Sequence, residues 1–125
     1  MKKLVLIAAL AVHIAGPALA QGAGHDHSAT HGGVFVAGKE ADYELVAKPD
    51  VIRLFVSDHG KPMDLSKAAA KVTLLSGSDK QEVELKPAGG ALEAKGAFKV
   101  APGTKVVAVV SNNGKTLGTA RFALK

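Results

Sequence analysis

From residue 33 onward, apolar and polar residues alternate with a period of two, in short runs separated by residues that favour tight turns. In the run 51–56, the apolar residues Ile52, Leu54 and Val56 share one side of an extended chain. A strand places successive side chains on opposite faces, whereas a helix repeats about every 3.6 residues, so this pattern predicts half-buried strands. Similar runs cover residues 33–37, 42–47, 71–76, 82–86, 91–95, 105–111 and 116–124.

The residues between these runs support the same interpretation. Asn113-Gly114 stands between two apolar runs and is typical of a two-residue hairpin, because both positions need a positive φ. Pro102-Gly103 fits a type II turn. A short helical turn is expected only in the alanine-rich segment 64–70. Seven or eight short antiparallel strands predict an all-β fold, namely an immunoglobulin-like β-sandwich, with a small open β-barrel as the alternative.

The first twenty residues have the pattern of a secretory signal peptide. Lys2 and Lys3 precede an apolar run, and residues 18–20 (Ala-Leu-Ala) suit cleavage by a signal peptidase. The apolar run is too short to span a bilayer comfortably, so we expect an exported, soluble chain with no membrane insertion after cleavage. The expected organisation is a cleaved signal peptide at 1–20, a flexible leader at 21–32 and a single β-sandwich domain at 33–125.

Charge and cysteine content argue against several classes of protein. The formal net charge is +5 and falls to +3 when Lys2 and Lys3 are removed with the signal peptide. The chain has one Tyr and no Trp, and its basic residues are spread among acids, so we expect no nucleic-acid partner. The absence of Cys excludes disulfides and thiolate metal sites. No nucleophile elbow, His-Glu-x-x-His helix or phosphate-binding glycine loop is present, and we expect no enzyme activity.

A histidine-rich tract lies between the signal peptide and the first expected strand. His25, His27 and His31 fall within seven residues, and Asp26 separates the first two. Neutral imidazole is a common ligand for zinc and also suits copper and nickel. We therefore predict a transition-metal site of His25, Asp26, His27 and His31, for copper or zinc, with nickel or cobalt as alternatives. Cleavage after Gly22 would make His25 the third residue and create a square-planar copper or nickel site, but residue 20 is the better cleavage point. The other interpretation is a flexible polar leader without a ligand.

Part of the chain resembles a known family of small domains. The His-Gly-Gly motif at 31–33, the Tyr-Glu-Leu-Val run at 43–46 and the stretch 52–64 are similar to the His-Gly-Gly domain at the amino end of periplasmic adaptor subunits of heavy-metal efflux pumps. They also resemble free-standing exported proteobacterial proteins that carry this domain alone. The resemblance covers roughly residues 31–123. It implies a periplasmic location and a role for His31 in meeting copper, zinc or related ions. The chain lacks the long helical hairpin and barrel with which the adaptors contact the pump.

Two further side chains, His59 and Met63, are not expected to belong to this site. His59 stands between Asp58 and Gly60, and turn chemistry accounts for it. If the first three strands form a meander, the end of the third strand also lies at the opposite end of the sheet from the start of the first, which would place His59 far from His31. Met63 follows a proline and is more typical of a gap-filling core residue than of a Cu(I) ligand.

Two function hypotheses follow from these observations. In the first, the chain is a periplasmic soluble metal-binding protein that captures or delivers copper, zinc or a similar ion, with a heavy-metal efflux or delivery protein as its partner. In the second, it is a non-enzymatic β-sandwich interaction module that docks on an envelope protein without metal, by a face or an exposed strand edge. Deletion of residues 21–31 separates them, because metal uptake would be lost under the first and partner binding retained under the second.

Overall fold

The computed structural model describes residues 29–125, and all of the regular structure in this part of the chain is antiparallel β-strand. The strands are β1 (Val34–Ala37), β2 (Asp42–Ala47), β3 (Val51–Asp58), β4 (Lys61–Pro62), β5 (Ala68–Ser76), β6 (Asp79–Ala88), β7 (Ala91–Lys95), β8 (Lys105–Asn112) and β9 (Lys115–Ala123). The all-β prediction is confirmed, and each strand-like run of the sequence corresponds to a strand, to within one residue at the ends of the runs 33–37 and 116–124. Within the described residues, no helix has the length and apolar character needed to cross a membrane.

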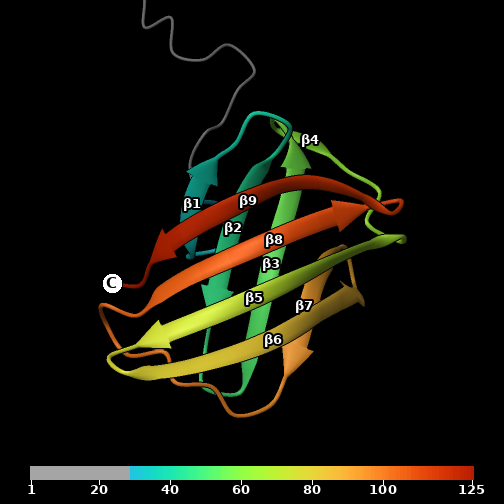
Figure 1. The fold of residues 1–125 in the computed structure, drawn as a ribbon. Coiled ribbons are helices and arrows are strands. Elements are labelled where there is room, and N and C mark those ends of the chain that lie inside the picture. The colour runs from blue at the N-terminus through green and yellow to red at the C-terminus, as the bar shows by residue number, and fades with distance from the viewer. Residues whose placement is uncertain (1–28) are drawn as a thin grey trace, which may run out of the picture.

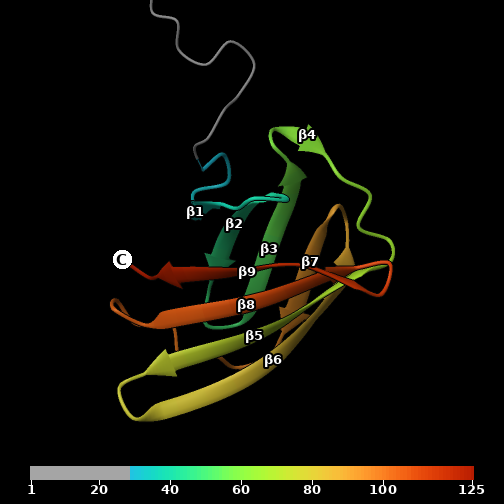
Figure 2. The ribbon, with the colours of Figure 1, turned by 45° about the horizontal axis from the view of Figure 1, so that its top comes forward.

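One sheet folds over into two layers. Its strand order is β1-β2-β3-β7-β6-β5-β8-β9, with the short β4 paired to β3. We call β1, β2, β3 and β7 layer A, and β6, β5, β8 and β9 layer B. The strands of layer B run steeply across those of layer A (Figure 1), and Figure 2 shows the same crossing after rotation. The start of β6 pairs with β5 and its end pairs with β7, so β6 joins the layers on one side. On the other side β1 contacts β9, which leaves the sheet nearly closed.

The core lies between the two layers and is made by alternate residues of each strand. Leu45, Ile52 and Leu54 face it from layer A, and Val72 and Val106 face it from layer B; each is at most 1% exposed. This is the period-two pattern that the sequence carries. Burial of each of these side chains stabilises the fold by about 1.5–3 kcal/mol. The opposite side of layer A carries Asp42 and Glu44 together with Phe35 and Phe55, and it holds the candidate site.

The turn predictions are confirmed by backbone conformation. Asn113 and Gly114 have φ values of 55° and 78° in the hairpin between β8 and β9. Gly103, after Pro102, has a φ of 89°. His59 also has a positive φ, of 48°, in the two-residue turn that joins β3 to β4.

The helical turn expected at 64–70 is wrong. The backbone N–H of Ser66 donates to Oδ1 of Asp64 at 3.0 Å, which makes a local turn, and the chain then enters β5. Ala68 and Ala70 are 4% and 2% exposed and face the core. Pairing of β5 with both β6 and β8 therefore overrides the helix propensity of these alanines.

Candidate functional site

Two acidic side chains are buried on the outer side of layer A. Asp42 and Glu44 alternate along β2 with Tyr43 and Leu45 of the core, so they point away from it, yet they are only 2% and 5% exposed. A buried carboxylate is costly unless charged or hydrogen-bonding groups compensate it. The groups that cover this part of layer A must therefore compensate the charge of both acids.

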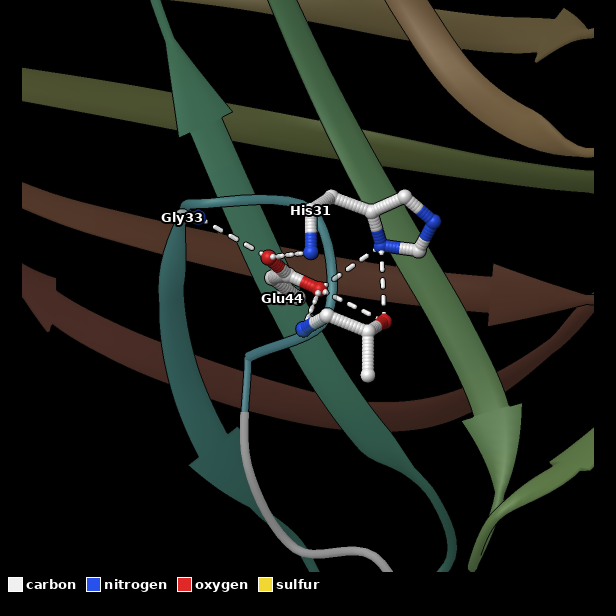
Figure 3. Close-up of polar contacts among 4 residues, drawn as sticks. His31, Gly33 and Glu44 are labelled. Atoms are coloured by element: carbon white, nitrogen blue, oxygen red, sulfur yellow. Dashed lines mark hydrogen bonds and ion pairs between the residues drawn. The ribbon is translucent and has the colours of Figure 1, made fainter.

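Glu44 is compensated by the segment that precedes β1. Its Oε2 accepts hydrogen bonds from the backbone N–H groups of His31 and Gly33, at 2.7 and 2.8 Å. Its Oε1 accepts one from the backbone N–H of Thr30 at 3.0 Å. Figure 3 shows this arrangement, in which the segment curls around a single carboxylate. Glu44 thus attaches the end of the leader to the sheet.

Backbone conformation and steric contact favour glycine at both positions after His31 in the His-Gly-Gly motif. Gly32 has a φ of 77°, a conformation that side chains rarely adopt. A Cβ at Gly33 would collide with the backbone carbonyl oxygen of Leu45 across the β1–β2 pair. Both glycines let the chain turn tightly enough for the backbone of His31 and Gly33 to reach the same oxygen of Glu44.

The ring of His31 is held in one orientation. Its Nδ1 lies 2.8 Å from Oε1 of Glu44 and 3.1 Å from Oγ1 of Thr30. Its face stacks on Phe55, with ring centroids 3.6 Å apart and an angle of 2° between the planes. An ionised carboxylate can only accept, so Nδ1 carries the hydrogen and the lone pair of the neutral ring is on Nε2. In Figure 3 this second ring nitrogen points away from Glu44.

The hydrogen bonds also decide the charge state of Glu44. Burial acts to raise the pKa of this carboxyl, but the hydrogen bonds from the His31 side chain and from the backbone of Gly33, His31 and Thr30 outweigh burial, so the pKa is lowered. Glu44 is therefore an anion at neutral pH, as the donor role of His31 Nδ1 requires.

A second histidine–carboxylate contact lies on the same outer side of layer A. His59 Nε2 is 3.0 Å from the backbone oxygen of Lys39, and His59 Nδ1 is 3.6 Å from Oδ1 of Asp42. Strands β1, β2 and β3 do form a meander. His31 and His59 nevertheless contact acids that are close together on β2, because the segment before β1 folds back and brings His31 level with Glu44. Asp42 and Glu44 are two residues apart on β2, which corresponds to about 7 Å.

A groove of about 480 Å³ runs over these side chains and is lined, among others, by Thr30, His31, Phe35, Asp42, Glu44 and Phe55. His25, Asp26 and His27 lie outside the described residues, so His31 is the predicted ligand whose surroundings the structure gives. Within residues 29–125, no group of three or more His, Asp, Glu or Cys side chains could hold a metal ion. Met63 packs against the core, which agrees with the gap-filling role expected for it.

Sequence reasoning missed Glu44 as a functional candidate. It is a polar residue in an alternating strand, and so are Glu82 and Glu84, which are exposed. The sequence feature that could have identified Glu44 is its position in the run 43–46, which the family resemblance includes, 11 residues after Gly33. Only the three-dimensional arrangement shows that it is the residue that holds His31.

Comparisons with known proteins give a distant structural neighbour. No protein-family model matches this chain, and no curated protein matches it. The chain is similar to a solved structure described as "Crystal structure of Br derivative BhCBM56", with 9% sequence identity, 73% of this chain and 99% of that chain covered, and a TM-score of 0.43. This similarity says nothing about what the present chain binds.

Proposed function

We propose that this chain is a periplasmic, non-enzymatic metal-binding protein that captures copper, zinc or a similar transition-metal ion through His31 together with His25, Asp26 and His27. It then passes the ion to a heavy-metal efflux or delivery protein. The observation that supports this proposal most is the 2.8 Å contact between His31 Nδ1 and Glu44 Oε1.

The same kind of contact, from a ligand histidine to a hydrogen-bond acceptor, is found around many metal sites. A histidine that ligates a metal through one ring nitrogen almost always donates its other N–H to a carboxylate, a carbonyl or water, which fixes the tautomer and makes the ligand more basic. His31 has such a carboxylate in Glu44, and its side chain is 47% exposed. Its Nε2 is therefore the nitrogen that we assign to the metal.

The attachment of His31 favours binding by preorganisation. Its backbone N–H is bonded to Glu44 and its ring is stacked on Phe55, so little freedom is left to lose when an ion arrives. The leader imidazoles of His25 and His27 then need only approach a ligand that is already oriented.

The donor set fits several metals of the first transition row. Three imidazoles and one carboxylate suit zinc, copper, nickel and cobalt, whereas thiolate-selective sites need cysteine. Since the described residues hold no complete set of ligands, the proposal requires the donors of the leader. Export to the periplasm rests on the signal-like pattern of residues 1–20 and on the His-Gly-Gly resemblance.

A titration of the mature protein with Cu(II), Zn(II), Ni(II) and Co(II) tests the proposal. The matched variant changes His25, His27 and His31 to Ala, and circular dichroism checks that its sheet is intact. We expect the wild type to bind at least one ion tightly and the variant to lose that binding. Equal binding by both proteins would overturn the proposal. Retention of an envelope partner after deletion of residues 21–31, without metal uptake by the wild type, would favour the docking module instead.

A further inference from the structure

A pocket of about 610 Å³ opens at the seam where the folded-over sheet fails to close. It lies between the turn that follows β1, at 37–40, and residues 117–119 of β9. Strands β1 and β9 contact each other, but within the described residues no strand pairs with the outer edge of β9. The pocket shares only Tyr43 with the groove over Glu44, so it is a separate feature of the molecule.

The side chain of Tyr43 lies between two glycines of this pocket. A Cβ at Gly38 would be 2.9 Å from Cε2 of the ring, and a Cβ at Gly118 would be 2.6 Å from the hydroxyl oxygen. Neither glycine could carry a side chain without displacing the ring. Because both glycines line the pocket, the hydroxyl end of Tyr43 lies at the part of the pocket that Gly118 lines.

The hydroxyl of Tyr43 is a polar group that the described part of the chain does not bond. Tyr43 is 2% exposed, and none of residues 29–125 makes a hydrogen bond with its hydroxyl oxygen. A buried tyrosine hydroxyl usually has a partner, and leaving it without one is destabilising. Phenylalanine would fill the same space without that cost. The hydroxyl is therefore available to a polar group that enters the pocket.

Side chains of opposite charge line the same pocket. Lys39 and Glu40 belong to the turn after β1, and Thr119 of β9 adds a second hydroxyl. The pKa of Tyr43 is raised, first by burial and then by the negative charges of Glu40 and Asp42. The phenol is therefore protonated at neutral pH and lies in a negative potential, which favours a positively charged group beside it.

We propose that this pocket binds a small zwitterion, such as a free α-amino acid, at a site separate from the proposed metal site. The ammonium group of the ligand donates to the phenol oxygen of Tyr43 and to the carboxylate of Glu40. The carboxylate of the ligand accepts from the ammonium group of Lys39 and from the hydroxyl of Thr119. Hydrogen bonds between charged groups are roughly twice as strong as neutral ones, so a ligand with both charges is preferred over a neutral polyol.

The edge of β9 adds main-chain groups to the pocket. Alternate residues of an edge strand present their N–H and C=O groups outward, and residues 117–119 of this edge line the pocket. The turn at 37–40 bounds the pocket on its other side, and β1 already contacts β9. These neighbours favour a small molecule over a partner strand along the whole of β9.

Nuclear magnetic resonance titration of the mature protein, freed of metal on a chelating resin, tests this inference. The probes are the standard L-amino acids, added one at a time. We expect at least one of them to move the amide resonances of Gly38 and Gly118. Tyr43→Phe keeps the ring and removes the hydroxyl, so it should bind that amino acid at least tenfold more weakly while thermal unfolding shows an intact fold.

Two further variants separate ligand binding from packing. In the double variant Tyr43→Phe with Gly118→Ala, the new methyl group takes the place of the hydroxyl at 3.7 Å from Cζ, an ordinary contact, so the protein should fold and bind no amino acid. Glu40→Gln should weaken binding of the amino acid but not of its N-acetyl derivative, which lacks the ammonium group. Glu82→Gln is the matched control, because Glu82 is an exposed acid of β6 outside the pocket.

Three results would overturn the inference. They are the absence of any shift at Gly38 and Gly118 with every amino acid, equal affinity of Tyr43→Phe and the wild type, and equal affinity of the wild type for the amino acid, its N-acetyl derivative and glucose. The last result would show recognition without charge. None of these measurements uses a metal or depends on His31, so failure here is distinguishable from failure of the proposed function.

Discussion

Glu44 holds both the backbone and the ring of His31: its Oε2 accepts the His31 N–H at 2.7 Å, and its Oε1 lies 2.8 Å from Nδ1. A ring held in this way cannot turn its Nδ1 toward an ion without breaking a contact to a buried anion. Nε2 is therefore the ligating atom in the proposed function, and Glu44 is a positioning residue rather than a ligand.

The Glu44→Gln change tests this positioning role. Glutamine keeps the shape but has one acceptor oxygen in place of two. Its NH2 group therefore faces either the backbone donors of His31 and Gly33 or the Thr30 N–H and the His31 ring, and that pair of donors loses its acceptor. We expect the free energy of unfolding to fall by about 1–3 kcal/mol. Zn(II) affinity should fall by about 10- to 100-fold, measured by competition with a chelator.

Glu93→Gln is the matched control for that change. Glu93 is also an acid of layer A with a cross-strand partner, Arg53, but it does not contact His31. Its substitution should leave Zn(II) affinity unchanged. A loss of affinity of the same size in both variants would mean that charge alone, and not the orientation of His31, controls binding.

The lowered pKa of Glu44 predicts a specific dependence of stability on pH. Because the folded-state pKa lies below the ordinary value of 4.5, the ionised carboxyl stabilises the fold above that value, and this stabilisation is lost as pH falls through the lowered pKa. Urea unfolding of wild type and Glu44→Gln should therefore differ most at neutral pH and converge in acid. A difference that stays constant from pH 7 to pH 3 would contradict the assignment.

The strands were predictable from sequence because their determinants are local. The alternation in residues 51–56 and the Asn113-Gly114 pair each act within a few residues. The alignment of Ile52 with Ala94 depends on contacts across more than 40 positions, so the order of strands was not predictable. His31 could be found because imidazole is a characteristic ligand. Glu44 could not, because its role depends on a segment that folds back over it.

Gly33→Ala should be strongly destabilising. The new Cβ would meet the backbone carbonyl of Leu45, and backbone cannot move aside without separating β1 from β2. We expect a loss of about 1–3 kcal/mol in the free energy of unfolding, measured in urea. Gly32→Ala is the comparison, since nothing lies within 4 Å of a Cβ there and only its φ of 77° opposes the change. An equal or larger loss at Gly32 would contradict the steric account of the motif.

Phe55→Leu should weaken metal binding more than it weakens the fold. The change removes the ring on which His31 stacks, while leucine still covers the same part of β3. A stacked pair contributes about 0.5–1.5 kcal/mol, so Zn(II) affinity should fall by roughly two- to tenfold as His31 gains freedom. Phe98→Leu serves as the control, because Phe98 packs against the core and should change unfolding without changing affinity. If Phe55→Leu binds Zn(II) as tightly as the wild type, Glu44 alone is sufficient to orient the imidazole.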